Sequence, residues 1–309
     1  MAYKVDNCMV IGVSSRALFD MTKANEIFEN EGVEAYREYQ YEHEDEVLKP
    51  GPGFALVKSL LGLNELSGGE KLVEVIIMSH NSNDTSLRVF NSIRHFGLDI
   101  TRAVLSGGAS LAPYLEAFHT DLFLSAYEDD VQAAIDSGIA AGIICTDNLP
   151  KFDEDMAINC AKDCMEQIRI AFDGDAVIFD DDSEKIFKEK GLEAFEENER
   201  LNAQNPLGEG PFAKFLKKLS AIQARFEGEK SPIRTALVTS RSAPAHERVI
   251  RTLRSWNVRI DESFFLGGIE KKDVLKAFGA QIFFDDQSIH TIPASKEVPA
   301  ARVPYKNDA

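Results

Sequence analysis

The chain has 309 residues, enough for two α/β domains, and 44% of them are hydrophobic, which favours a packed globular protein. Its formal net charge of −17 argues against nucleic acid or an anionic membrane surface as a partner, because both attract clustered lysine and arginine. No stretch approaches the ~20 apolar residues that cross a bilayer, and the polar start predicts no signal peptide. The four cysteines lack a paired zinc-ribbon spacing, and we expect a cytoplasmic protein.

The first half of the chain alternates between strand-like and helix-like patterns. Short apolar runs predict buried strands, and apolar residues three or four positions apart predict helices. The expected strands are 9–13, 73–78 and 122–124, and the expected helices are 21–41, 54–63, 86–96 and 111–118. Strands that alternate with helices indicate a parallel sheet covered by helices, so the fold class is α/β.

The second half repeats this order about 160 residues later. Chance can produce a few identical residues, since alanine, leucine and glutamate are common. A nearly constant offset between the matched residues of the two halves is harder to explain by chance. The matched pairs include Phe19-Asp20 with Phe179-Asp180, Ile27-Phe28 with Ile186-Phe187, Gly107-Gly108 with Gly267-Gly268, and Phe123 with Phe283. We therefore predict two Rossmann-like lobes from an internal duplication, with the boundary between them in 146–155.

The apolar run Ile168–Phe172 ends in two aspartates, Asp173 and Asp175, on either side of Gly174. If the strand stops at Asp173, both carboxylates lie at its carboxyl end, where open α/β sheets bind their ligands. Asp-Gly-Asp is also ordinary turn chemistry, so the motif alone leaves a catalytic role and a turn open.

Three further strand ends of the second half carry reactive groups. These groups are Thr239, which precedes Ser240 and Arg241, then Lys271, and the pair Asp285-Asp286. In an open parallel sheet such ends converge on one crevice, so the set is more informative than any member. The matching positions of the first half lack these charges; Val13 and Ser15, for example, stand opposite the aspartates. We therefore expect the second half to be catalytic.

Each of these groups also has an ordinary structural role. Thr239 and Ser240 are both good helix N-caps, and Asp285-Asp286 is compatible with a turn. Either Lys271 or its neighbour Lys272 can be a solvated lysine at the start of a helix, and the spacing from the Gly-Gly pair favours Lys271 for the site.

The order of these motifs resembles the haloacid dehalogenase superfamily of phosphatases. The segments 172–177, 239–248 and 283–287 are similar to the cytosolic 5′-nucleotidase type I family, and so is 13–19 in the first half. The resemblance implies a Mg²⁺-dependent hydrolase that converts nucleoside 5′-monophosphates, such as AMP and deoxynucleotides, to nucleoside and phosphate.

The resemblance also implies the domain organisation. Residues 1–150 would form a degenerate haloacid dehalogenase-like lobe that lacks catalytic residues, and residues 151–309 would form the catalytic lobe. A helical cap inserted at about 183–228 would close over the active site and exclude water.

Each predicted catalytic residue then has a role. Asp173 attacks phosphorus and forms an aspartyl-phosphate, while Asp175 protonates the departing 5′-oxygen and later takes a proton from water. Thr239 holds a phosphoryl oxygen, and Lys271 neutralises charge on the transferring group. Because a phosphate dianion repels a carboxylate, the attack needs a cation, and Mg²⁺ prefers oxygen ligands. The expected ligands are Asp173, the backbone carbonyl of Asp175, and one of Asp285 or Asp286.

The residues expected to contact the substrate are Thr239, Ser240, Arg241, Lys271 and Phe212. Phe212 lies in the loop expected to approach a nucleoside, where it either stacks on the base or staples the next helix. His246 and Arg248 are open between substrate contact and surface, and Arg248 leans towards a structural role because Arg88 matches it in the first half.

Two other functions fit the same sequence. One is a phosphatase that acts on another small phosphomonoester, and the other is a regulatory protein that senses nucleotides. The polar segments Ser14–Arg16 and His80-Asn81 of the first half either support the interface between the lobes or bind an effector nucleotide. We expect a small nucleotide as the binding partner, with neither nucleic acid nor membrane, and leave open whether the chain forms a homo-oligomer.

Overall fold

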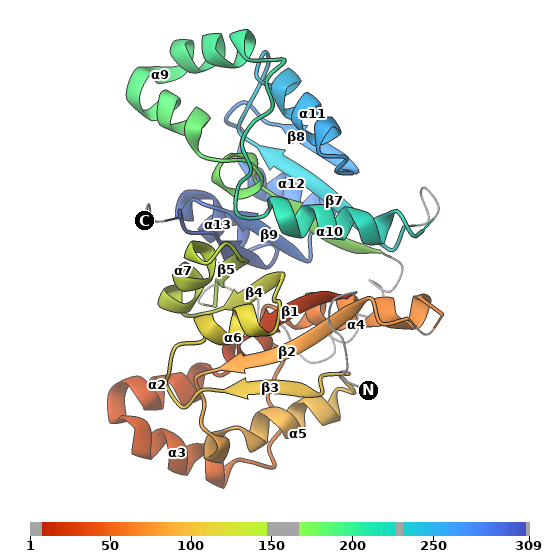
Figure 1. Cartoon of the computed structure of the whole chain (residues 1–309). Coiled ribbons are helices and arrows are strands. Elements are labelled where there is room, and N and C mark those ends of the chain that lie inside the picture. The colour runs from red at the N-terminus through yellow and green to blue at the C-terminus, as the bar shows by residue number, and fades with distance from the viewer. Residues whose placement is uncertain (1–7, 69, 147–166, 227–230, 307–309) are drawn as a thin grey trace.

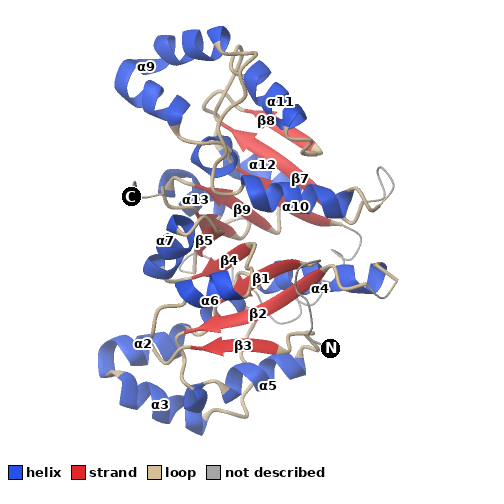
Figure 2. Ribbon diagram, in the orientation of Figure 1, coloured by secondary structure: helices blue, strands red, loops and turns tan. Residues whose placement is uncertain are grey.

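The computed structural model describes residues 8–68, 70–146, 167–226 and 231–306. Within these ranges the strands form one ten-stranded sheet flanked by helices (Figure 2). The strands are β1 (Met9–Val13), β2 (Val73–Ser79), β3 (Arg102–Leu105), β4 (Leu122–Ser125), β5 (Ala140–Ile144), β6 (Ile168–Phe172), β7 (Ile233–Thr239), β8 (Glu262–Phe265), β9 (Ile282–Asp285) and β10 (Ala300–Arg302).

The helices confirm the predicted α/β class. They are α1 (Ser15–Leu18), α2 (Thr22–Glu31), α3 (Val33–Glu42), α4 (Phe54–Leu66), η1 (Asn83–Thr85), α5 (Leu87–His95), α6 (Ala112–Ala117), α7 (Glu128–Asp136), η2 (Gly174–Ile178), α9 (Asp182–Leu201), α10 (Ala213–Gln223), α11 (His246–Ser255), α12 (Lys271–Phe278) and α13 (Ser288–Ala294). None of the helices in the described ranges has the length and hydrophobicity that a bilayer crossing requires.

The sheet has the strand order β3-β2-β1-β4-β5-β10-β9-β6-β7-β8. Counted from either edge towards the centre, the two halves of the chain contribute their strands in the same order. Neighbouring strands are parallel, as predicted, except for β5 and β10, which meet antiparallel in the middle through Ile144 opposite Ala301. Two predicted lobes thus share one continuous sheet, a feature that the sequence pattern did not reveal.

Glycines at matching positions of the two halves adopt the same backbone conformation, which supports the internal repeat. Gly32 and Gly191 have φ values of 89° and 82°, in the range that glycine adopts without strain. The first separates α2 from α3, and the second bends α9. The continuous helix predicted over 21–41 is therefore wrong: the left-handed glycine breaks it into two.

The predicted cap over 183–228 is too long. Of this segment, α9 projects from the sheet at one end of the molecule, as the pair α2–α3 does at the other end (Figure 1). By contrast, α10 covers the sheet, because Phe215 is buried and its ring centroid lies 6.4 Å from that of Phe172 on β6. Only α9 and its flanking loops stay candidates for a cap, and 227–230 lies outside the described residues. Most of the predicted boundary, 147–155, also lies outside them.

The seam between the two halves is tightly packed at Gly142 on β5. A Cβ atom added there would lie 2.9 Å from Cβ of Ala301 and 3.1 Å from Cε1 of Phe284. We expect Gly142→Ala to lower the free energy of unfolding by about 1–3 kcal/mol, because the seam is overpacked. Urea denaturation followed by circular dichroism measures this change.

Gly62 in α4 provides the matched control. No heavy atom lies within 4 Å of a Cβ built at Gly62. The substitution Gly62→Ala therefore should stabilise the helix by about 0.5–1 kcal/mol. Equal effects of the two substitutions would contradict the close packing of the seam.

Candidate active site

The predicted reactive residues come from neighbouring strand ends. Asp173 directly follows β6, Thr239 ends β7, and Asp285 ends β9. Since β6 pairs in parallel with both β7 and β9, these three ends lie at one edge of the sheet. Lys271 is the first residue of α12, the helix that follows β8. The crevice predicted from the sequence is thus present in the structure.

Lys271 lies between two aspartates. Its Nζ is 2.8 Å from Oδ1 of Asp173 and 2.6 Å from Oδ2 of Asp285, and its side chain is 2% exposed. Burial alone lowers the pKa of this lysine, but the two carboxylates outweigh burial and raise the pKa above its usual value. Lys272 is 39% exposed and binds Glu270 instead. The structure therefore favours Lys271 over its neighbour, as the glycine spacing predicted.

Three buried carboxylates meet beside this lysine. Asp173, Asp285 and Asp286 each offer an oxygen, and the three oxygens lie within 4.8 Å of one another. Burial raises the pKa of Asp173 well above its usual value, against the opposing effect of Lys271. Burial and the charge of Asp285 likewise raise the pKa of Asp286 to about 7, although a hydrogen bond from Tyr305 opposes the shift.

The donor set of this cluster fits a hard divalent cation. Magnesium and calcium take oxygen ligands, usually from carboxylates. Oδ1 of Asp286 is buried and has no hydrogen-bond partner, so this oxygen is available for a metal ion. The other oxygen of Asp286 accepts a hydrogen bond from the hydroxyl of Tyr305, which fixes the orientation of the carboxylate.

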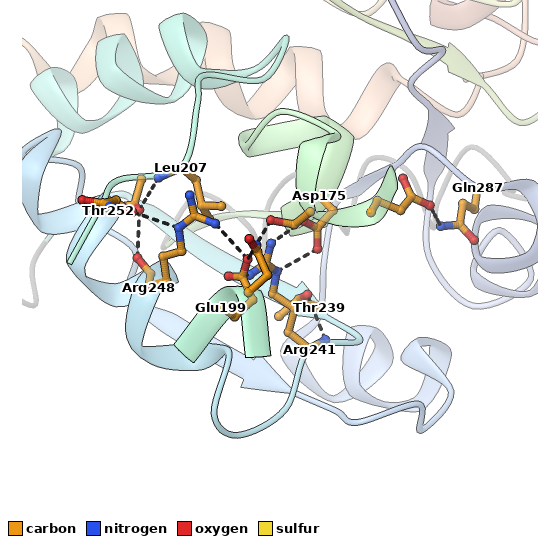
Figure 3. Close-up of polar contacts among 12 residues, drawn as sticks. Asp175, Glu199, Leu207, Thr239, Arg241, Arg248, Thr252 and Gln287 are labelled. Carbon is orange, nitrogen blue, oxygen red and sulfur yellow. Dashed lines mark hydrogen bonds and ion pairs between the residues drawn. The ribbon is translucent and has the colours of Figure 1, made fainter. Parts of the chain in front are cut away.

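Asp175 is held by Arg241. The guanidinium donates from Nε to Oδ2 of Asp175 over 2.8 Å and from Nη2 to Oδ1 over 2.6 Å, a bidentate ion pair (Figure 3). Burial lowers the pKa of Arg241, but Asp175 and Glu199 raise it above its usual value. Arg241 was predicted to contact substrate. In this structure its guanidinium donates hydrogen bonds to the carboxylates of Asp175 and Glu199 instead.

Glu199 connects α9 to the loop after β7. This fully buried carboxylate on α9 accepts hydrogen bonds from Arg241 and, over 2.9 Å, from Nη1 of Arg248 (Figure 3). The hydroxyl of Ser183 donates a third bond over 2.8 Å. Arg248 thus has the structural role towards which its match with Arg88 pointed. The network holds α9 beside the end of β7 and Asp175.

A cavity of about 330 Å³, here called the active-site pocket, opens between these strand ends and α9. Asp173, Asp175, Thr239 and Lys271 form its charged end. Its other wall is apolar and comes from α9, through Phe187, Leu192 and Phe195. A pocket with a charged end and an apolar wall suits a ligand that is charged at one end and apolar at the other, and an anion would need a cation to offset the aspartates.

Six predicted site residues line this pocket: Asp173, Asp175, Thr239, Ser240, Arg241 and Lys271. Thr239 and Ser240 do not cap a helix, because α11 begins only at His246 after Ala245. The oxygen of Thr239 accepts a hydrogen bond from the backbone N–H of Arg241 over 3.2 Å. This bond holds the turn after β7 in place.

The prediction that Phe212 contacts substrate is wrong. Its side chain is 0% exposed and packs against the rings of Phe172, Phe215 and Phe284. The alternative role, anchoring the next helix, describes the structure, since α10 begins directly after Phe212. Burying the phenylalanine ring in the core is more favourable than leaving it exposed to solvent, because apolar surface is then removed from water.

Sequence reasoning missed the residues that α9 and the C-terminal segment bring to the site. The group comprises Glu184, Leu192, Phe195, Glu199, Gln287, His290 and Tyr305. One signal was present: Phe187 matches Phe28 in the repeat, although both are exposed apolar residues. Glu199 gave no signal, because its partner Arg241 lies 42 residues away in the sequence.

Removing Glu199 should destabilise the protein strongly. The substitution Glu199→Ala leaves Arg241 and Arg248 in a buried site with one carboxylate fewer, and breaking such a network costs about 3–5 kcal/mol of unfolding free energy. Urea denaturation measures the loss. Glu197→Ala, on the same helix, removes only an exposed ion pair with Arg200 and should leave the midpoint unchanged. Similar midpoints for both variants would contradict the buried network.

Comparison with known proteins identifies the family. The sequence model of the 5′-nucleotidase family matches residues 1–309. The chain is 40% identical over 299 residues to human cytosolic 5′-nucleotidase 1B, in an alignment that covers 93% of this chain and 47% of that protein. The chain thus spans about half the length of the curated relative it matches. By the full-length match to the family model, this chain belongs to the 5′-nucleotidase family.

Proposed function

We propose that this chain is a Mg²⁺-dependent 5′-nucleotidase, a phosphoric monoester hydrolase that converts nucleoside 5′-monophosphates to nucleoside and phosphate. The observation that carries the proposal is Lys271 beside Asp173 and the three-carboxylate cluster, within a pocket that has an apolar wall. We take AMP and deoxynucleoside monophosphates as the substrates on the family resemblance. The cytosolic relative supports a cytoplasmic location.

The proposal assigns the catalytic half to residues 151–309, as a haloacid dehalogenase-like lobe with α9 as its cap, and treats 1–150 as a degenerate lobe. The identical strand order of the two halves supports this division. So does the distribution of charge, because Val13 and Leu111 of the first half occupy the positions of Asp173 and Lys271.

Asp173 would act as the nucleophile. Its carboxylate attacks phosphorus in line with the departing 5′-oxygen, and the aspartyl-phosphate that forms is then hydrolysed. Lys271 would hold Asp173 in place through their 2.8 Å contact and attract the phosphoryl oxygens. Thr239, one strand away, would donate its hydroxyl hydrogen to another phosphoryl oxygen.

The carboxylates of Asp173, Asp285 and Asp286, together with the backbone carbonyl of Asp175, would hold the magnesium ion. The bound ion would neutralise the charge that otherwise keeps the phosphate and Asp173 apart. The partnerless oxygen of Asp286 supports its direct participation. The two oxygens of Asp285 would bind the ion while they also hold Lys271 and the backbone N–H of Gln287.

Asp175 would be the general acid and base. Its carboxylate lines the pocket but binds Arg241, so it must turn from the guanidinium to reach the leaving oxygen. Glu199 already shares Arg241 and can keep that side chain in place during the turn. Ser240, which is exposed at the pocket rim, would contact the phosphate or sugar.

Phosphate release from AMP in the presence of Mg²⁺ tests the assigned roles. We expect Asp173→Asn to abolish turnover, because no nucleophile remains. Lys271→Met should lower kcat ~10²–10³-fold through lost charge stabilisation, and Asp175→Asn ~10²–10⁴-fold through lost acid/base help. Lys272→Met, the matched control, should leave kcat unchanged because Lys272 binds Glu270 outside the pocket.

Turnover that persists in Asp173→Asn would contradict the mechanism. Nucleotide binding without turnover in the unmodified protein would contradict the proposed activity and favour a sensing role. A panel of phosphomonoesters that includes sugar phosphates tests the substrate class: faster hydrolysis of a sugar phosphate than of AMP would contradict the nucleotide assignment.

Stabilisation by Mg²⁺ should depend on pH through Asp286. Burial raises its pKa to about 7 in the folded state from its usual 3.8, so between these values the folded state holds a proton that the unfolded state lacks. Without metal, this group's contribution to stability therefore falls as the pH rises from about 4 to 7. Because Mg²⁺ replaces the proton, we expect it to raise the Tm more at pH 8 than at pH 5.5.

Thermal unfolding in EDTA and in excess Mg²⁺, at both pH values, measures this effect. Asp286→Asn keeps the size of the side chain and removes its charge, so it should shrink the Mg²⁺-induced shift at pH 8. A shift that is the same at both pH values, or unchanged in the variant, would contradict the role of Asp286 in metal binding.

A further inference from the structure

The first half of the chain has a cavity of its own, here called the first-half pocket. Its volume is about 350 Å³, close to the 330 Å³ of the active-site pocket. It lies beside the carboxyl ends of β1 and β2, the strands that match β6 and β7, and beneath the helix pair α2–α3, which matches α9. The two pockets thus occupy equivalent places in the two halves.

The apolar wall is the same in both pockets. Phe28, Val33 and Tyr36 line the first-half pocket about 160 residues before Phe187, Leu192 and Phe195, which line the active-site pocket. Each pair has a similar shape and chemistry. If the wall of the active-site pocket binds a nucleoside, the matching wall of the first-half pocket can pack against a nucleoside in the same way.

The charged end, in contrast, has lost its acids. Ser15 and Asn25 take the places of Asp175 and Glu184. None of the described residues that line the first-half pocket is acidic, although the chain has a net charge of −17. The positions of the proposed metal ligands Asp173, Asp285 and Asp286 are held by Val13, Ser125 and Ala126. The described lining of this pocket therefore has no counterpart of the proposed nucleophile Asp173 and no carboxylate cage for a metal ion.

An arginine lines the first-half pocket instead. Arg16 lines the first-half pocket, at the position that matches Ala176. It forms no ion pair with any described residue, and its guanidinium lies 5.8 Å from the ring centroid of Tyr127. Nearby, Nδ2 of Asn81 is buried without a hydrogen-bond partner, because only Oδ1 of this amide is used, by the hydroxyl of Tyr36. An unpaired guanidinium and a free amide N–H are donors suited to a phosphate.

We propose that the first-half pocket binds a nucleoside monophosphate without a metal ion and does not hydrolyse it. The phosphate lies against Arg16 and the amide of Asn81, and the base lies against the wall of Phe28, Val33 and Tyr36. Arg16 supplies the positive charge that a metal ion supplies in the other half. This second site goes beyond the proposed hydrolytic function, which concerns the active-site pocket alone.

Titration calorimetry with AMP in EDTA tests the proposal on the full chain. We expect one metal-independent site, and Arg16→Ala should weaken it ~10- to 100-fold, the usual effect of losing a charged hydrogen bond. Arg94→Ala, an exposed arginine on α5 of the same half, is the charge-matched control and should bind AMP as the unmodified chain does. Unchanged affinity in Arg16→Ala, or no binding in EDTA, would overturn the proposal.

A pair of blocking variants separates the two pockets. Val33 and Leu192 are 62% and 56% exposed at equivalent places on the two walls, so a tryptophan at either position fills its own pocket and leaves the core intact. We expect Val33→Trp to abolish AMP binding in EDTA and to retain Mg²⁺-dependent phosphate release. Leu192→Trp should do the reverse. If Leu192→Trp instead removes the binding in EDTA, the metal-independent site is the active-site pocket and the proposal fails.

Two further probes test the ligand class. Inorganic phosphate should bind in EDTA at least 10-fold more weakly than AMP, since it makes no contact with the apolar wall, and adenosine should bind more weakly because it lacks the phosphate. Phosphate that binds as tightly as AMP would overturn the nucleotide assignment. Both measurements stand whether or not the chain hydrolyses AMP, so a failure of the proposed function is distinguishable from a failure of the second site.

Discussion

The site depends on a charge imbalance, in which one lysine lies beside three buried carboxylates. Lys271 contacts Asp173 and Asp285 directly, while Asp286 lies within the same small volume. Burying a charge is costly unless an opposite charge lies beside it, and one ammonium group balances three carboxylates only in part. The raised pKa values of Asp173 and Asp286 reflect this imbalance. Protons or a divalent cation can balance the remaining negative charge, and in the proposed mechanism the magnesium ion would do so beside Lys271.

Helix α9 connects the apolar wall of the pocket to the carboxylate of Asp175. The same helix supplies the apolar wall, through Phe195, and the buried carboxylate of Glu199. Arg241 binds both Glu199 and Asp175. A displacement of α9 would therefore move the guanidinium that holds the proposed acid. In the proposed mechanism, a nucleoside that packs against this helix would act on Asp175 through two ion pairs, which would couple binding to catalysis.

Local patterns in the sequence predicted strands in both halves, their parallel pairing and the residues at the strand ends, but they did not reveal β5 or β10. They also favoured Lys271 over Lys272 as the lysine of the site, because of its spacing from the glycine pair that precedes α12. What they missed depends on contacts between distant segments: the antiparallel meeting of β5 and β10, the burial of Phe212, and the partners of Glu199. Helix periodicity also carried through Gly32, where a left-handed backbone conformation ends α2. Local sequence patterns thus predict where strands and turns lie better than they predict the contacts between distant segments.

The two pockets of this chain differ in charge rather than in shape. Phe28 and Val33 are 47% and 62% exposed, and their counterparts Phe187 and Leu192 are exposed to a similar degree, so these side chains add little to the core. Their recurrence in a half without a nucleophile therefore calls for a reason other than folding stability. In the proposed second site, neutral groups in place of the carboxylates, together with Arg16, would attract an anion without a metal ion. If the two halves arose by the duplication that we propose, recognition and hydrolysis would have separated between their pockets, because the apolar wall and the charged end come from different elements of the fold.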